Sequence, residues 1–131
     1  CIRDSVYAAI LALIFIALSV RTLRLRRHLN IAVGDKNDLQ MLRSMRVHAN
    51  FAEYVPLTLL LIYMYEAGNG MIHVVHALCI ALIIGRLAHA YGVGRIEEDY
   101  RFRVFGMALT FTALSGAALG VLVVYWPGFL A

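Results

Sequence analysis

The chain has 131 residues, of which 62% are hydrophobic and only 15% are charged, whereas a soluble domain is roughly half apolar and about a quarter charged. This excess, with a mean hydropathy of +0.76, argues against a soluble domain and for an integral membrane protein. The net charge of +4 does not indicate nucleic-acid binding, because the cations flank apolar segments and need not form a free basic patch.

Four apolar segments, each close to the ~20 residues that a spanning helix needs, predict four transmembrane helices. They cover Ile2–Val20, Ala49–Ala67, Met71–Tyr91 and Val104–Ala131. The first is the least secure, because its uninterrupted core, Val6–Val20, must extend into the following arginines to reach full length. We do not interpret it as a cleaved signal peptide, since its positive charges follow the apolar run and no small-residue cleavage site comes after it.

The cations are distributed unevenly along the chain. Eleven of the 12 Lys and Arg residues lie in residues 21–46 or 86–103, and Arg3 is the exception. With four spans these two regions emerge on one side, which the positive-inside rule assigns to the cytoplasm. We therefore expect both termini on the non-cytoplasmic side. The second region includes a loop with Glu97, Glu98 and Asp99, which we interpret as solvated and of mixed charge.

A collar of arginines, at positions 21, 24, 26 and 27, follows the first apolar segment. Cations beside a span attract anionic lipids, so charge alone favours a stop-transfer collar that binds lipid headgroups. The alternative is that some of these arginines reach a ligand site. Further along, Asp38 is a good N-cap residue and predicts that a second helix begins near Leu39.

The start of the second apolar segment carries polar side chains at helical spacing. Arg46, Asn50 and Glu53 stand at i, i+4 and i+7, so a helix places them on one face. Ionisable groups in a membrane helix are costly and usually face a bundle interior or a wet cavity. Arg46 alone could snorkel to the headgroups, but the side chains of Asn50 and Glu53 are too short to do so.

The third apolar segment contains two pairs of polar residues. His73 and His76 lack a third ligand, so we expect interfacial histidines and no metal site. Cys1 and Cys79 also lack metal-binding spacing.

Near the inner end of that segment, Arg86 and His89 share a face, and Arg86 needs a carboxylate or a ligand anion as partner. We expect Glu53 to be that partner. In the fourth segment, Gly116 and Gly120 form a small-xxx-small pair suited to close helix packing.

The candidate site residues fall at the predicted cytoplasmic ends of the spans, where four helix ends would form a cation-rich pocket. They lie in residues 24–27, 46–53 and 86–91 and at Arg103. Guanidinium groups recognise carboxylates through paired, charge-assisted hydrogen bonds. A ligand amine would suit Glu53, and a ligand thiol beside an arginine would have a lowered pKa and act as a nucleophilic thiolate. Glutathione has two carboxylates, one amine and one thiol, although other small dianions also fit.

The motif Arg46-x-x-x-Asn50-x-x-Glu53, followed by Tyr54 and Pro56, resembles the signature of the MAPEG family, the membrane-associated proteins in eicosanoid and glutathione metabolism. The resemblance covers nearly the whole chain and implies one domain over residues 1–131. Through the sequence Gly85-Arg86-Leu87-x-His89-x-Tyr91-Gly92, it is closest to the small bacterial inner-membrane branch, which is related to the microsomal glutathione S-transferases.

The resemblance implies an all-α integral membrane four-helix bundle that forms a homotrimer, with glutathione as cosubstrate between adjacent subunits. It implies a transferase or peroxidase that conjugates or reduces hydrophobic electrophiles from the bilayer. Arg103 takes the place of the arginine thought to activate the thiol. The implied glutathione-binding residues are Arg24, Arg26, Arg27, Arg46, Asn50, Glu53, Tyr54, Arg86, His89 and Tyr91.

Two features leave alternatives open. In several family members a tyrosine follows the His89 position by four residues, and here that residue is Val93, while Arg101 could compete with Arg103. A non-catalytic protein that binds glutathione or another small anion on the same scaffold is therefore the alternative function. A transporter is disfavoured, because the chain has no inverted repeats or broken helices.

Overall fold

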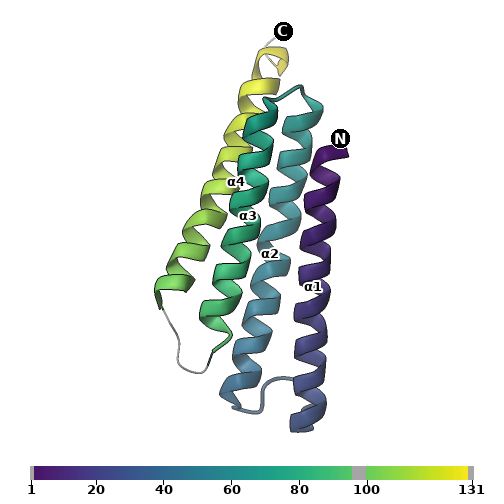
Figure 1. The fold of residues 1–131 in the computed structure, drawn as a ribbon, viewed down its shortest axis with the longest axis vertical. Helices are drawn as coiled ribbons and strands as arrows, with labels where there is room; N and C mark the ends of the chain where they lie inside the picture. The colour runs from purple at the N-terminus through teal and green to yellow at the C-terminus, as the bar shows by residue number, and fades with distance from the viewer. Residues whose placement is uncertain (1, 96–99, 130–131) are drawn as a thin grey trace.

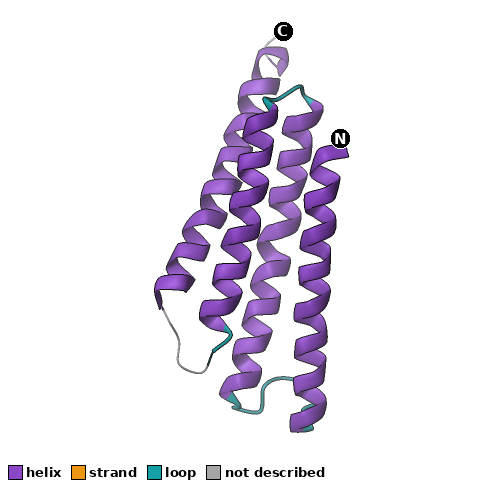
Figure 2. Cartoon of the chain, in the orientation of Figure 1, coloured by secondary structure: helices purple, strands orange, loops and turns teal. Residues whose placement is uncertain are grey.

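The computed structural model describes residues 2–95 and 100–129 of the chain. All regular secondary structure within this part is helical: α1 (Ile2–Leu29), α2 (Leu39–Ala67), α3 (Ile72–Val93) and α4 (Tyr100–Phe129). The four helices run up and down side by side, and α1 begins and α4 ends toward the same end of the bundle (Figure 1). The predicted all-α four-helix bundle is therefore confirmed (Figure 2). Cys1 and the acidic residues Glu97, Glu98 and Asp99 lie outside the described residues.

Three of the helices are long and apolar enough to cross a membrane, namely residues Ser5–Leu29, Ile72–Val93 and Tyr100–Trp126. The remaining helix, α2, has 29 residues, but Asn50 and Glu53 lower the hydropathy of its apolar half. Because α1 and α3 run in the same direction, the chain between them must return across the same thickness, and α2 is the segment that does so (Figure 1). The whole bundle thus forms one membrane unit.

The first helix is longer than its apolar segment, because nothing in the arginine collar breaks it and arginine favours helices. It ends where Asn30 adopts a left-handed conformation with φ of 52°. The amides of Asn30 and Ile31 then donate to the carbonyls of Arg27 and Arg26 at 3.4 and 3.0 Å, which is the Schellman pattern of helix termination. The collar is therefore a rigid continuation of α1.

The second helix begins as the sequence predicts. Asp38 is its N-cap, and Oδ1 of Asp38 accepts a hydrogen bond from the backbone amide of Met41 at 2.7 Å. This bond satisfies one of the amides left free at a helix start. The helix continues through Pro56 to Ala67.

Two polar contacts fix α1 against α2. The Ser19 hydroxyl donates to the carbonyl of Phe15 at 2.9 Å, so its oxygen accepts from Nε2 of His48, also at 2.9 Å. One turn further on, the hydroxyls of Thr22 and Ser44 lie 3.0 Å apart. Hydrogen bonds of this kind hold membrane helices together where the hydrophobic effect cannot. They orient α2 so that its opposite face is free to form a site.

Glycines allow close helix packing inside the subunit. A Cβ atom on Gly116 would lie 2.9 Å from Cδ2 of Leu78, and one on Gly120 would lie 2.8 Å from Cδ2 of Tyr65. The predicted close packing on this pair therefore occurs against α3 and α2 of the same chain, which leaves the pair unavailable as a surface between subunits.

A second close approach joins α3 to α4. A Cβ atom on Gly106 would lie 2.6 Å from both the carbonyl oxygen of Gly85 and the backbone nitrogen of His89. Only glycine permits this separation. The approach brings the first turns of α4 against the part of α3 that carries Arg86 and His89.

Candidate functional site

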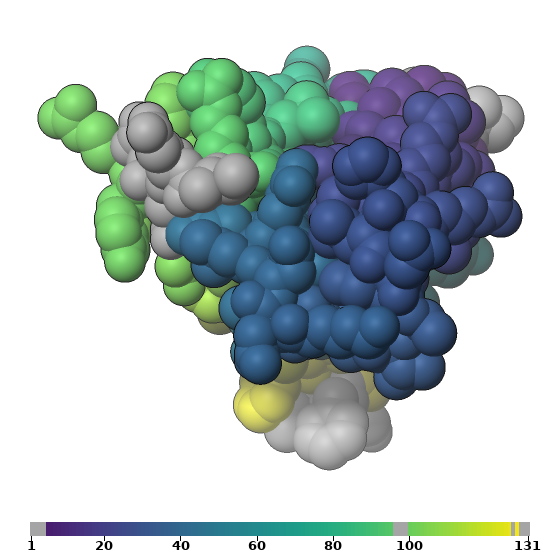
Figure 3. All heavy atoms as spheres, turned by 90° about the horizontal axis from the view of Figure 1, so that it is seen from below, coloured from purple at the N-terminus to yellow at the C-terminus, as the bar shows by residue number. Residues whose placement is uncertain are grey.

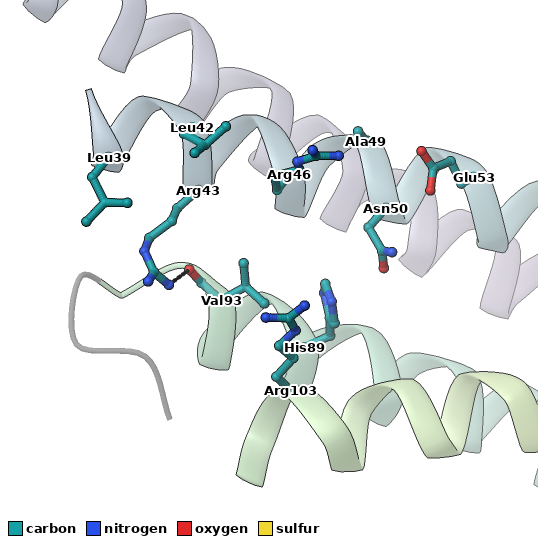
Figure 4. A pocket seen from close by; sticks show the side chains of 10 residues that line it. All are labelled: Leu39, Leu42, Arg43, Arg46, Ala49, Asn50, Glu53, His89, Val93 and Arg103. Carbon is teal, nitrogen blue, oxygen red and sulfur yellow. Dashed lines mark hydrogen bonds between the residues drawn. The ribbon is translucent and has the colours of Figure 1, made fainter. Parts of the chain in front are cut away.

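A cavity of about 420 Å³ lies between α2, α3 and α4, at the end of the bundle where α3 ends and α4 begins (Figure 4). Its volume is within the ~300–1,000 Å³ of small-molecule sites. Figure 3 views the bundle from this end, with the first turns of α2 between α1 and the green helices α3 and α4. The lining residues are Leu39, Leu42, Arg43, Arg46, Ala49, Asn50, Glu53, His89, Val93 and Arg103.

One face of α2 forms the longest wall of this cavity. Its lining positions recur every three or four residues, which is the period of a helix face, so the predicted grouping of Arg46, Asn50 and Glu53 is found in the structure. The same face also presents Arg43, which sequence reasoning missed. Its spacing of three residues from Arg46 and seven from Asn50 would have identified it. Arg43 donates from Nη1 to the carbonyl of Val93 at 3.3 Å (Figure 4).

Arg86 is a buried cation beneath the cavity, with only 2% of its surface exposed. Its Nη1 donates to Oδ1 of Asn50 at 2.6 Å and its Nη2 to the sulfur of Met107 at 3.4 Å. The expected pairing of Arg86 with Glu53 is therefore wrong. Asn50 lies three residues earlier on α2 and is rotated toward α3, whereas Glu53 is exposed at the side of the cavity.

This contact also determines what Asn50 can offer to a ligand. An arginine donates only and a side-chain amide can do both, so the bond fixes the Asn50 oxygen toward Arg86. The NH₂ group of Asn50 is then left to donate. Figure 4 shows the Asn50 side chain pointing across the cavity toward His89. Arg86 therefore affects the cavity by orienting the Asn50 side chain. The NH₂ group of Asn50 would then donate a hydrogen bond to an acceptor atom of the ligand.

The opposite wall comes from α3 and α4. His89 is 6% exposed, and the Arg103 side chain extends from the first turn of α4 toward His89 and Val93 (Figure 4). Arg101 is exposed and does not line the cavity. Of the two arginines left open by the sequence, Arg103 is thus the one placed at the site.

The predicted α1 arginines do not reach this cavity within one chain. Arg26 donates to the carbonyl of Gly34 at 3.1 Å and to the sulfur of Met45 at 3.4 Å. Arg24 lines a separate groove on α1, and Arg27 is exposed. Their glutathione-binding role stays a prediction, and it would require a neighbouring subunit.

The two predicted tyrosines lie beside the cavity and not in it. The ring of Tyr54 is 5.9 Å from the guanidinium carbon of Arg86 and packs edge-on against Phe111 at 5.5 Å. Tyr91 is half exposed, packs edge-on against Phe102 at 5.1 Å, and lies under Arg95 at 4.1 Å. Tyr54 can therefore influence the site through Arg86, whereas Tyr91 is directed elsewhere.

No group of three or more His, Cys, Asp or Glu side chains that could hold a metal ion occurs in residues 2–95 and 100–129. Nδ1 of His76, one of the two histidines considered as ligands, lies 2.8 Å from the Tyr7 hydroxyl.

The charges around the cavity are strongly unbalanced. Among residues 2–95 and 100–129, Arg43, Arg46 and Arg103 line it, Arg86 contacts the lining residue Asn50, and Glu53 is the one acidic lining residue. A concave site with charges of one sign attracts ligands of the opposite sign. The arrangement therefore suits a small anion, with one position for a positively charged group.

Comparison with known proteins identifies the family of this chain. The model of the MAPEG family matches residues 5–123. The chain belongs to the MAPEG family. It is also 33% identical over 111 residues to "Inner membrane protein YecN" of Escherichia coli strain K12, a match that covers 85% of this chain and 83% of the relative.

The protein of the same name from Escherichia coli O6:H1 matches to the same extent. Membership of the MAPEG family makes the chain a membrane protein related to glutathione and eicosanoid metabolism. The three apolar helices and the inner-membrane relatives together support an integral inner-membrane protein.

Proposed function

We propose that this MAPEG protein is a glutathione-dependent membrane enzyme, a transferase or peroxidase that conjugates or reduces hydrophobic electrophiles entering from the bilayer. The observation that carries the proposal is the cavity at the ends of α2, α3 and α4. It combines three arginines, one carboxylate and one oriented amide in a chain of a family that acts on glutathione.

Each charged group of glutathione has a matching residue in this cavity. Arg43 and Arg46 can hold its carboxylates through charge-assisted hydrogen bonds, and Glu53 can meet its amine. The amide NH₂ of Asn50 can donate to a carboxylate or peptide oxygen. Arg103, at the other wall, would stabilise the thiolate. In conjugation the thiolate sulfur attacks the electrophilic carbon, and the electron pair of the broken bond leaves with the departing group. In reduction of a hydroperoxide the thiolate attacks the terminal peroxide oxygen, the O–O bond breaks, and the alkoxide that leaves takes a proton from water. A second glutathione then converts the sulfenic acid into glutathione disulfide and water.

The exposed charges of α2 support association with further copies of the chain, and the family resemblance makes the proposed assembly a homotrimer. Arg46 and Glu53 are exposed on the same side of α2 as Leu57 and Leu60. Charged side chains that face lipid at membrane depth are costly, whereas a second copy would cover them. A neighbouring subunit would also bring α1 arginines near the cavity, as the family resemblance implies.

A second candidate is a non-catalytic protein that binds glutathione or another small anion. The observation that favours it is Val93, which lines the cavity beside Arg103. Several family members have a tyrosine at this position, and valine offers no hydroxyl to a thiolate.

The decisive experiment measures glutathione binding by calorimetry on detergent-purified protein, followed by turnover with a nitro-activated aryl chloride and with an organic hydroperoxide. Saturable binding with turnover supports the enzyme. Binding without turnover of either substrate supports the second candidate. If glutathione does not bind, the enzyme is ruled out, and the second candidate then requires saturable binding of another small anion in the same assay. Arg103→Ala is the matched variant, because it should lose turnover while it retains most of the binding.

A further inference from the structure

One imidazole lies among the residues that line the cavity between α2, α3 and α4. His89 comes from the last turns of α3, it is 6% exposed, and it is the one histidine among the lining residues of the described chain. Its ring faces the wall formed by α2, with the Asn50 side chain opposite (Figure 4). A ligand in the cavity would therefore lie between the imidazole and the Asn50 amide.

The backbone holds His89 and Arg103 in a fixed relation. A Cβ atom on Gly106 would lie 2.6 Å from the nitrogen and 2.9 Å from the Cα of His89, so α4 touches α3 at the His89 backbone. Arg103 precedes Gly106 by three residues, which is roughly one helical turn. The arginine proposed to stabilise the thiolate and the imidazole thus stand on the two sides of one close helix contact. Catalytic groups have to be held in place in this way before the reaction.

The two reactions of the proposed function differ in their need for an acid. When the O–O bond of an alkyl hydroperoxide breaks, the leaving alkoxide is a strong base and needs a proton. When an aryl chloride is conjugated, the leaving chloride is a stable anion and needs none. A proton donor in the cavity would therefore serve the reduction and not the conjugation.

Among the lining residues in the described part of the chain, His89 is the one suited to supply this proton. Arginine keeps its proton up to a pKa above ~12, carboxylic acids are ionised at neutral pH, and amide and aliphatic side chains have no labile proton. Histidine titrates near neutral pH, and a general acid works best when its pKa lies near the working pH.

We propose that His89 is the general acid of hydroperoxide reduction. The inference rests on the proposed function and assigns one step of its peroxidase reaction. The glutathione thiolate attacks the terminal peroxide oxygen, the O–O bond breaks, and its electron pair stays on the alkoxide oxygen. The imidazolium of His89 donates its proton to that oxygen, which gives the alcohol and a neutral imidazole. Water then returns a proton to the imidazole, so the proton is drawn from water through His89.

The sulfur is oxidised to the sulfenic acid while the peroxide is reduced, and a second glutathione then gives the disulfide and water. The family resemblance gives His89 a place in glutathione binding, and the acid step adds a role for the same ring in the reaction that follows binding.

The test compares the two reactions of this site in detergent-purified wild type and His89→Gln. Glutamine can donate a hydrogen bond but cannot transfer a proton at neutral pH. Turnover of an alkyl hydroperoxide should fall about a hundredfold, the usual contribution of general acid catalysis. Turnover of a nitro-activated aryl chloride should stay within about threefold of wild type, since that reaction needs no acid. Glutathione affinity, measured by calorimetry, should change by no more than about tenfold, the loss of one hydrogen bond.

A peroxy acid separates proton transfer from the positioning of the peroxide. Its carboxylate leaving group needs no proton, so its reduction by His89→Gln, after subtraction of the uncatalysed rate, should stay within about threefold of wild type. His89→Asn is a smaller second substitution and should show the same selective loss. His73→Gln is the matched control, because His73 is an exposed histidine of α3 that does not line the cavity, and it should change neither reaction.

The inference is overturned if turnover of the alkyl hydroperoxide is unchanged in His89→Gln, or if it falls together with turnover of the peroxy acid or the aryl chloride. The first result would mean that water protonates the alkoxide directly, and the second that His89 only binds or positions ligands. Wild type that conjugates the aryl chloride but does not reduce the hydroperoxide refutes this inference alone. Wild type that turns over neither substrate refutes the proposed enzyme as well.

Discussion

At the scale of single residues, the structure shows which of the two candidate arginines, Arg101 or Arg103, lies at the cavity. Arg101 and Arg103 are two residues apart on α4, and a two-residue step turns a helix by about 200°. The two side chains must therefore point to nearly opposite sides, and only Arg103 lines the cavity. Its role in activating a thiol remains a prediction.

We predict that Arg103→Ala moves the thiolate absorbance of bound glutathione to higher pH, because the thiolate loses its cation. Each pKa unit corresponds to about 1.4 kcal/mol. Arg46→Ala should act on affinity and weaken binding about ten- to a hundredfold, the loss of one charged hydrogen bond. Ultraviolet titration and calorimetry separate the two effects. Arg101→Ala is the control, and if it abolishes the thiolate signal while Arg103→Ala does not, the assignment is off by two residues.

We predict that Asn50 is required for stability, because its Oδ1 accepts the hydrogen bond from the buried Arg86 guanidinium. Asn50→Leu keeps the volume but removes the acceptor of a buried guanidinium, which should cost about 1–3 kcal/mol. Asn50→Asp restores an acceptor and should retain most of the stability. Both changes can be followed by thermal unfolding in detergent.

Glu53→Gln provides the comparison for Asn50. Glu53 is exposed and forms no ion pair with any described residue, so its substitution should change stability by no more than about 0.5 kcal/mol. A loss of stability in Glu53→Gln as large as that in Asn50→Leu would contradict this prediction and would indicate that Arg86 pairs with Glu53.

At the scale of the helices, the close contact between α3 and α4 at Gly106 holds the first turn of α4, which carries the lining residue Arg103, against α3. We predict that Gly106→Ala destabilises the protein by about 1–3 kcal/mol, the usual cost of overpacking, since its Cβ would meet the backbone of Gly85 and His89 at 2.6 Å. The displaced α4 should also carry Arg103 away from the cavity. Thermal unfolding and the thiolate titration measure the two effects.

The matched control for Gly106 lies on the same helix. A Cβ on Gly128 would meet nothing within 4 Å, so Gly128→Ala should leave both stability and the thiolate signal unchanged. Equal behaviour of the two alanine variants would mean that the close approach of α3 and α4 is not needed.

The sequence predicts the helices well because local signals determine where they begin and end. Asp38 caps α2 at the predicted position, and apolar length indicates the bundle. The apolar segment stops at Val20, and the expected extension of the first helix into the arginines is found, with α1 ending at Leu29. The partner of Arg86 was missed. Helical spacing places Asn50 and Glu53 on one face, but only the rotation of α2 against α3 decides which of them Arg86 meets.

At the scale of the whole molecule, the distribution of cations predicts orientation. Eleven of 12 Lys and Arg residues lie in residues 21–46 and 86–103, which the antiparallel helices bring to the same end of the bundle (Figure 1). The positive-inside rule places that end in the cytoplasm. Reporter fusions at both termini should therefore report the non-cytoplasmic side, and insertions at Gly34 the cytoplasmic side. A cytoplasmic C-terminus would reverse the topology.

The last prediction concerns assembly. The exposed side of α2 carries Arg46 and Glu53 together with apolar residues such as Leu57 and Leu60. Since lipid cannot solvate those charges well, we expect α2 to face α2 of neighbouring copies and native mass spectrometry in detergent to show a trimer.

Cysteine crosslinking tests which surface makes that assembly. Leu60→Cys should form a disulfide between copies under mild oxidation, because Leu60 is 54% exposed on α2. Leu119→Cys, at a residue 62% exposed on α4, is the control and should not crosslink. If α4 crosslinks and α2 does not, no second copy covers the charged side of α2, and the cavity is open to lipid along that side. The ligand would then have to neutralise Arg46 without help from a second subunit.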